Sequence, residues 1–230
     1  MFRRQRSLSF IDNERDTGRV EAFSDGVIAI AITLLVLDIH VPEATTHSGH
    51  LLEELLKLWP SYLSYITSFA VIGIIWLNHH RMYSYIRHTD HISLALNTLA
   101  LMFVSFIPFP TAVLASYIQQ LDDNHAAAVL YSGTLLVTTL LFNILWWYAA
   151  HGRRLMDKDL DANVIRAISR AYVLGIPLYL LSFVLAFIWV PGCLLIYLLT
   201  SVVYFFSAGS IPVNGSSRRT VGFTKDDSPN

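Results

Sequence analysis

Charged residues are scarce in this chain. They make up 14% of its 230 residues, whereas hydrophobic residues make up 54%, and the mean hydropathy is +0.49. A soluble domain usually carries about 25% charged residues, so this composition excludes an ordinary water-soluble protein. The formal net charge of -1 adds little, because the placement of the charges matters more than their sum. We therefore expect a multi-pass membrane protein.

Cysteine is also nearly absent. Cys193 is the single one, which excludes an intrachain disulfide. Residues 1–18 are polar and charged and lack the apolar core that a cleavable secretion signal requires. No cysteine or tight group of carboxylates completes a metal-ligand set around the histidines. We expect no cofactor, no resident metal and no nucleic-acid partner.

Long apolar runs account for most of the chain. A bilayer core of about 30 Å needs roughly 20 helical residues to cross it. Pro108 and Pro110 interrupt the third of the qualifying runs, and Val190-Pro191-Gly192 is expected to turn the hairpin between the last two. The sequence therefore predicts an all-α fold of six transmembrane helices. The predicted spans are about residues 20–39, 58–78, 92–117, 126–150, 171–189 and 193–208.

The basic residues indicate the orientation of these spans. All of the 16 Lys and Arg residues except Lys57 flank the predicted spans on one side. Because Lys and Arg gather on the cytoplasmic side of membrane proteins, both termini are predicted to be cytoplasmic. We expect a cytoplasmic N-terminal segment over residues 1–18, a transmembrane domain over 19–208 and a disordered cytoplasmic tail over 209–230.

The first span has two unlike faces. At 100° per residue, a helix places Asp25 opposite a stripe that is apolar except for one hydroxyl. The stripe packs against lipid or neighbouring spans, or it forms a hydrophobic constriction that gates ions by excluding water. One helix cannot surround a pore, but several copies around a symmetry axis can. The stripe comprises Ile30, Thr33, Leu34 and Leu37.

Two motifs at the ends of the first two spans are specific in combination. The first is Arg19-x-x-x-Phe23-Ser24-Asp25, and the second is Trp76-Leu77-Asn78-His79-His80. With the six-span plan, they resemble the transmembrane protein 175 family of potassium channels, over about residues 15–208. The resemblance implies passive potassium flux through a central pore lined by the first helix of each subunit. A chain with one six-span unit is similar to prokaryotic members, which implies a homotetramer in the cell membrane, with monovalent cations and the lipid bilayer as its other partners.

The resemblance also implies roles for individual residues. The narrowest ring of the pore falls on Ile30, and further apolar rings fall on Leu34 and Leu37. The hydroxyl ring that the family links to potassium preference over sodium falls on Thr33. A hydrogen-bonded cluster that anchors the pore helix is expected from Arg19, Phe23, Ser24, Asp25, Trp76, His79 and His80.

Two other classes of protein compete with a channel. A secondary transporter or proton-coupled carrier would use the Asp25/His79/His80 cluster, although carriers normally place polar groups at the bilayer midplane, whereas these lie at the cytoplasmic edge. An intramembrane hydrolase would use Ser24, Asp25 and His79 as a triad. No Gly-rich oxyanion loop or second acid accompanies them, so we do not expect an enzyme.

Several polar residues admit more than one interpretation. For His79, His80, His88 and His91 we favour structural hydrogen bonding, with pH modulation and metal binding as alternatives. For Asn97 and Asn143 we favour hydrogen bonds between helices over contact with a substrate. Residues 220–223 (Thr-Val-Gly-Phe) imitate a carbonyl filter but lie in the polar tail. Selectivity is therefore expected to come from side chains and pore width.

Overall fold

The structure is a computed structural model that describes residues 2–42, 51–157 and 160–207. Within these ranges the regular structure is helical, apart from one isolated bridge between Ile86 and Met156. The predicted all-α fold is therefore confirmed for this part of the chain. The expected tail over residues 209–230, including the sequence at 220–223, lies outside the described residues.

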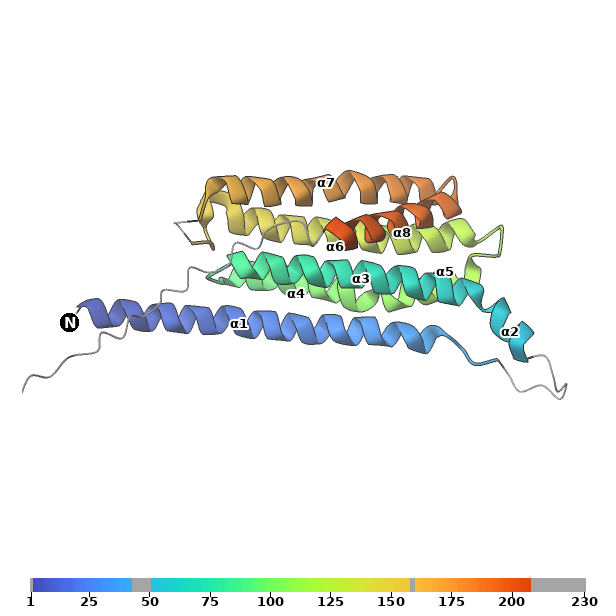
Figure 1. Ribbon diagram of the computed structural model, residues 1–230, viewed down its shortest axis with the longest axis horizontal. Coiled ribbons are helices and arrows are strands. Elements are labelled where there is room, and N and C mark those ends of the chain that lie inside the picture. Colours follow the sequence, from blue (N-terminus) through green and yellow to red (C-terminus); the bar gives the residue numbers. More distant parts are fainter. Residues whose placement is uncertain (1, 43–50, 158–159, 208–230) are drawn as a thin grey trace, which may run out of the picture.

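The chain forms a bundle of long helices (Figure 1). Two single turns of 3-10 helix, η1 and η2, extend the C-terminal ends of α1 and α6. The elements are α1 (Phe2–Leu34), η1 (Leu35–Asp38), α2 (Leu51–Lys57), α3 (Trp59–Tyr85), α4 (His91–Phe106), α5 (Pro108–Tyr117), α6 (Asn124–Ala150), η2 (His151–Arg153), α7 (Ala162–Ala186) and α8 (Val190–Ser207).

Five segments of the described chain are long and apolar enough to cross a membrane. They match the first five predicted spans in place and composition. The sixth predicted span coincides with a shorter apolar helix, Val190–Tyr204, so the sixth crossing stays a prediction. The five segments are Thr17–Asp38, Trp59–Tyr85, His91–Tyr117, Asn124–Arg153 and Ala162–Ala186.

Local chemistry explains several helix boundaries. The predicted interruption of the third span is present, since α4 ends at Phe106 and α5 begins at Pro108. Asp90 caps α4 by accepting a hydrogen bond from the Ser93 backbone N–H at 2.8 Å, while the Ser93 hydroxyl accepts one from the Asp90 N–H. This reciprocal pair is a capping box, which satisfies two donors that the helix cannot pair itself.

The predicted turn between the last two spans is misplaced. We expected Val190-Pro191-Gly192 to form it, but α8 already begins at Val190. The chain turns just before, where the Trp189 N–H donates to the Leu185 carbonyl oxygen at 2.7 Å. Proline is well accommodated in the first turn of a helix, because its missing N–H would have no partner there. Pro191 therefore starts α8 instead of ending α7.

The helices lie in layers across the bundle. Helix α1 runs along one edge, α3, α4 and α5 lie beside it, and α6, α7 and α8 lie on the far side (Figure 1). Accordingly, α1 packs on α3, α4 and α5, whereas α7 packs on α6 and α8. Helices α1 and α7 thus occupy opposite sides of the molecule, and this arrangement decides which faces remain open for lipid or for other subunits.

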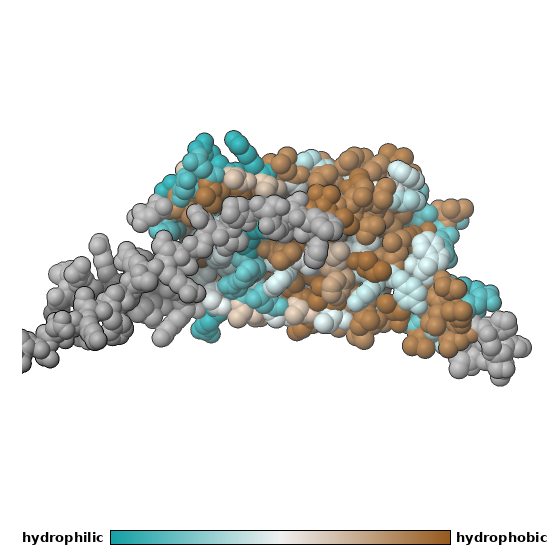
Figure 2. All heavy atoms as spheres, in the orientation of Figure 1, coloured by the Kyte–Doolittle hydropathy of each residue, from teal (hydrophilic) through white to brown (hydrophobic). Residues whose placement is uncertain are grey.

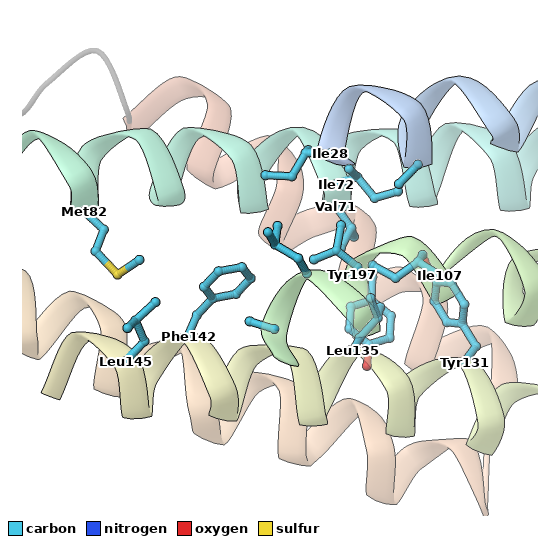
Figure 3. Packing of buried hydrophobic residues seen from close by; sticks show 14 of the residues in the cluster. Ile28, Val71, Ile72, Met82, Ile107, Tyr131, Leu135, Phe142, Leu145 and Tyr197 are labelled. Carbon is cyan, nitrogen blue, oxygen red and sulfur yellow. The ribbon is translucent and has the colours of Figure 1, made fainter. Parts of the chain in front are cut away.

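Buried side chains from four helices meet at the centre of the bundle. Ile28 of α1, Ile72 of α3, Leu135 of α6 and Tyr197 of α8 are each at most 2% exposed (Figure 3). Lipid tails are as apolar as these side chains, so close packing and interhelical hydrogen bonds replace the hydrophobic effect as the main force within a membrane.

One such hydrogen-bond network joins three helices. The Ser68 hydroxyl donates to the Tyr131 hydroxyl at 3.0 Å and lies 2.9 Å from the Thr111 hydroxyl. Thr111 in turn donates to the Ile107 carbonyl oxygen at 2.8 Å. The network fixes α3 against α5 and α6. Helix α1 contributes no residue to it.

Candidate functional site

Helix α1 and its η1 extension present a small, buried face to the bundle. The residues of this face recur at helical spacing and are at most 2% exposed. They lie against α3, α4 and α5. This seam sets the rotation of α1 about its own axis, because it is the part of α1 that is buried among the neighbouring helices. Its members are Ser24, Ile28, Ala31 and Leu35.

The opposite face is apolar and open. Ile30 is 62% exposed, Leu34 41% and Leu37 69%, and two turns before Ile30, Phe23 is 60% exposed. The structure therefore places the three predicted gate residues on one uncovered face, although Leu37 belongs to η1 and not to α1. Four large apolar side chains on one helix face form a patch of the kind that marks a protein or membrane contact.

Thr33 lies exposed on the same face. Its hydroxyl donates back to the helix, with its oxygen 3.0 Å from the Ala29 carbonyl oxygen and 2.9 Å from the Ile30 carbonyl oxygen. A hydroxyl carries one donor and two acceptor lone pairs. Since the hydrogen is used within the helix, the oxygen retains lone pairs that can face a cation.

A hydrogen bond joins the motif aspartate to the second motif. The Trp76 indole N–H donates to Asp25 Oδ1 at 3.0 Å. The Trp76 ring also stacks on the His80 ring, with centroids 6.0 Å apart and planes 23° apart. His80 Nδ1 lies 2.8 Å from Glu21 Oε1. These four side chains form one patch that bridges α1 and α3 near the cytoplasmic ends expected for both helices.

A second, buried chain of hydrogen bonds runs beside this patch. The Asn97 amide donates to the Ser24 hydroxyl at 3.0 Å, and Ser24 donates to the Val20 carbonyl oxygen at 2.8 Å. His79 Nε2 lies 3.1 Å from Asn97 Oδ1, which can only accept, so this nitrogen carries the proton. His79 Nδ1 is buried and has no hydrogen-bond partner in the described part of the chain.

Two motif residues lie apart from both networks. Arg19 is exposed and makes no hydrogen bond or ion pair with the described residues of this chain. Phe23 lies on the open face of α1. Within one chain, five residues of the predicted cluster therefore take part in the two networks, and Arg19 and Phe23 do not. The five are Ser24, Asp25, Trp76, His79 and His80.

Two residues of the site were absent from the predicted cluster. Asn97 connects Ser24 to His79, and Glu21 meets His80. The signal for Asn97 was an amide within an apolar span, and its predicted interhelical bond is confirmed. The same prediction is wrong for Asn143, whose amide donates to the Thr139 carbonyl oxygen of its own helix at 2.9 Å.

The remaining histidines do not extend the site. His91 opens α4 and is exposed. The His88 N–H donates to the Leu155 carbonyl oxygen at 3.2 Å, beside the Arg87 N–H, which donates to the same oxygen at 2.8 Å. No group of three or more His, Cys, Asp or Glu residues within residues 2–42, 51–157 and 160–207 is placed to hold a metal ion.

Comparison with known proteins identifies the family. A family model described as "Endosomal/lysosomal potassium channel TMEM175" matches residues 19–108. A potassium channel of Streptomyces collinus is 44% identical over 197 residues, which cover 86% of this chain and 95% of that protein. This chain belongs to the TMEM175 family. A potassium channel of Chamaesiphon minutus is 48% identical over 176 residues, covering 76% of this chain and 86% of that protein.

A solved structure of a TMEM175 protein agrees with this assignment. A crystal structure of a lysosomal potassium-selective channel TMEM175 homolog from Chamaesiphon minutus superposes with a TM-score of 0.77 at 42% identity, covering 85% of this chain and 99% of that one.

A vertebrate relative matches a smaller part of the chain. The human TMEM175 protein, named as an endosomal/lysosomal proton channel, is 36% identical over 139 residues, which are 57% of this chain and 27% of that protein.

Proposed function

We propose that this protein is a potassium channel of a prokaryotic cell membrane, through which K⁺ moves passively down its electrochemical gradient. Two relatives that match most of the chain are named as potassium channels. K⁺ is the permeant substrate, and the mechanism calls for no cofactor and no enzymatic step. The observation that carries the proposal is the open apolar face of α1, on the side of the helix opposite its packing seam.

Four copies assemble around a common axis with the open faces of α1 turned inward. A face of exposed Phe, Ile and Leu side chains requires a cover, and copies of the same face around a rotation axis supply one while leaving a narrow conduit. Six spans, with both termini in the cytoplasm, complete each subunit. Helix α7, on the opposite side of the bundle (Figure 1), then faces lipid.

Rings of Ile30, Leu34 and Leu37 form the gate. Their spacing of four and three residues stacks them along one face of the helix, so equivalent side chains from four subunits meet at successive depths. A narrow apolar ring resists wetting, which blocks a hydrated ion until the ring widens. The gate therefore needs no charged residue and no moving domain.

Thr33 contributes to ion preference between the Ile30 and Leu34 rings. Four hydroxyl oxygens with free lone pairs replace part of the water around a cation at this depth. Because each hydroxyl hydrogen is bonded within its own helix, the ring offers oxygen to the ion without reorienting. A carbonyl filter is not required.

The α1–α3–α4 networks hold the tilt of the pore helix. Asp25 is bound to Trp76, and Ser24 is bound through Asn97 to His79. Both networks lie on the side of α1 away from the open face. They therefore fix the helix without obstructing the ion path.

Purified protein in liposomes tests this function. With an outward K⁺ gradient, a channel gives rapid K⁺ efflux and discrete single-channel currents in planar bilayers. Slow flux that depends on a fixed stoichiometry with protons would instead identify a carrier that uses Asp25, His79 and His80. Proton flux without K⁺ flux would align the chain with its vertebrate relatives and overturn the potassium assignment.

A further inference from the structure

The lipid side of helix α7 carries two arginines at one end of an apolar stripe. Arg166 and Arg170 are exposed and one turn apart, and exposed apolar residues continue the same helical stripe beyond them. Helix α7 and its neighbour α6 contain no Asp or Glu. The rest of the stripe comprises Val173, Pro177, Leu180 and Val184.

These arginines are available for a ligand. Arg170 makes no hydrogen bond or ion pair with the described residues. Arg166 donates to the Asn163 side-chain oxygen at 2.8 Å, which is a neutral partner. The carboxylate of Asp161 already accepts from the Asn163 N–H at 2.8 Å as the cap of α7. The two positive charges are therefore not neutralised by a carboxylate on their own helix.

Aromatic residues on α6 mark the membrane depth of this end of α7. The Trp146 indole N–H donates to the Ser169 hydroxyl at 2.9 Å, which aligns the two helices at this level. Next to it, Trp147 is 66% exposed, and its ring lies 5.2 Å from that of His151. Exposed tryptophans concentrate at the membrane–water interface. Arg170 therefore lies at the depth of lipid headgroups.

The surface view agrees with this depth. Hydrophilic atoms gather at the end of the bundle where α7 begins, and hydrophobic atoms predominate on the visible surface toward the other end (Figure 2). One leaflet of the hydrocarbon core is roughly 15 Å thick, or about ten helical residues at 1.5 Å each. Val173, Pro177 and Leu180 follow Arg170 within that length, so acyl chains can lie along them.

We propose that Arg166 and Arg170 bind the headgroup phosphate of an anionic glycerophospholipid in the cytoplasmic leaflet, whose acyl chains lie along the apolar stripe of α7. The charge of the pair selects an anionic headgroup, and the apolar stripe selects a lipid over free phosphate. Guanidinium groups suit this ligand because they donate two hydrogen bonds in one plane to phosphate oxygens. The inference rests on the proposed function in one respect: α1 faces the symmetry axis of the channel, so α7 faces the bilayer.

The test measures lipid retention on the full-length protein. Protein purified in mild detergent is given phosphatidylglycerol or phosphatidylcholine, and bound lipid is counted by native mass spectrometry. The wild type should prefer phosphatidylglycerol. Since each basic side chain near an anionic surface contributes roughly fivefold to binding, Arg166→Gln with Arg170→Gln should reduce this preference about 25-fold. The charge-preserving Arg166→Lys with Arg170→Lys should keep most of it.

Lys57→Gln is the matched control, because Lys57 is an exposed basic residue on α2, on the outer side. It is ion-paired with Glu53 and Glu54, and its loss should leave lipid preference unchanged. An equal loss of phosphatidylglycerol preference in the Lys57 variant, or a wild-type preference in the double glutamine variant, would overturn the lipid site. A change of oligomeric state in the double variant would do so too, by making the face a protein contact.

Potassium flux is measured on the same samples in phosphatidylcholine liposomes. The double glutamine variant should conduct there like the wild type, because the lipid site is far from the pore helix. Absence of flux from every sample, including the wild type, would refute the channel proposal while leaving the lipid result to stand alone.

Discussion

Trp76 of α3 donates its indole N–H to the Asp25 carboxylate of α1 at 3.0 Å. This bond pairs a polar aromatic side chain with the acid that ends the motif Phe23-Ser24-Asp25, and it lies on the side of α1 away from the open face. A hydrogen bond to a charged acceptor contributes roughly 1.5–3 kcal/mol in folded proteins. It therefore fixes the orientation of α1 against α3.

Asp25→Ala should lower the stability of the assembled protein by about 1–3 kcal/mol, because the Trp76 N–H loses its acceptor. Asp25→Asn, which keeps an acceptor oxygen, should lose less. Thermal unfolding followed by size-exclusion chromatography measures both. Normal assembly and unchanged thermal stability of Asp25→Ala would remove the anchoring role of the carboxylate.

Asn97→Leu should destabilise the protein by about 1–3 kcal/mol, since a buried donor and a buried acceptor lose their partners. His79 Nε2 loses its acceptor, and the Ser24 hydroxyl loses the donor from Asn97 while keeping its own bond to Val20. Asn143→Leu is the matched control, because among the described residues that amide bonds to its own helix and not to another. Thermal unfolding of the two variants in the same detergent measures the difference. Equal losses of stability would show that the interhelical hydrogen bonds of Asn97 contribute nothing specific.

Thr33→Val should reduce the preference for K⁺ over Na⁺ while leaving a conducting channel. The substitution keeps the volume of the side chain but removes the hydroxyl oxygen that we propose faces the pore. Thr33→Ser retains that oxygen and should retain most of the preference. Reversal potentials under K⁺ and Na⁺ gradients measure the ratio. An unchanged ratio in Thr33→Val would place ion selection elsewhere.

Acid should destabilise the connection between α4 and α6 through Asp90. Burial of the Asp90 carboxyl acts to raise its pKa, but hydrogen bonds from Ser93 and Tyr148 and the charge of Arg154 outweigh burial and lower the pKa below its ordinary value of 3.8. The Tyr148 hydroxyl donates to Asp90 Oδ2 at 2.7 Å, and Arg154 Nε lies 3.4 Å from the same oxygen.

A carboxyl whose pKa is lowered by folding stabilises the protein above its unfolded pKa and loses that effect as the pH falls through the folded pKa. The contribution of Asp90 to the thermal stability of the wild type should therefore be constant down to about pH 5 and should fall below about pH 4. Asp90→Asn retains a helix cap but not the charge, so its melting temperature should fall less between pH 5 and pH 3. Parallel curves for the two proteins would exclude this contribution.

The sequence predicted the spans better than it predicted their ends. Hydropathy located five helices because the bilayer fixes their length and composition. It placed the first span at about residues 20–39, close to the apolar segment Thr17–Asp38. It did not indicate that α1 extends back to Phe2, because hydropathy does not detect a helix in a polar segment. Pro191 was interpreted as a turn residue, although proline suits the first turn of α8 equally well.

The candidate site was predictable in its faces and less so in its contacts. Helical periodicity placed Asp25 opposite Ile30, as the structure does, because rotation about one helix depends only on sequence spacing. Which polar groups meet across helices depends on the packing of three helices at once. Hence the sequence predicted that Asn97 joins two helices, but not that its partners are His79 and Ser24. Arg19 was predicted to belong to the hydrogen-bonded cluster, but it makes no such contact with the described residues of one chain.

The central claim is that the open face of α1 forms a water-excluding ring at Ile30. Single-channel conductance of Ile30→Asn in planar bilayers tests it most directly, with Ile30→Val as the control that stays apolar. The amide should hydrate the ring and raise conductance or open probability several-fold, while Ile30→Val should resemble the wild type. Wild-type conductance and open probability in a folded Ile30→Asn channel would contradict the account.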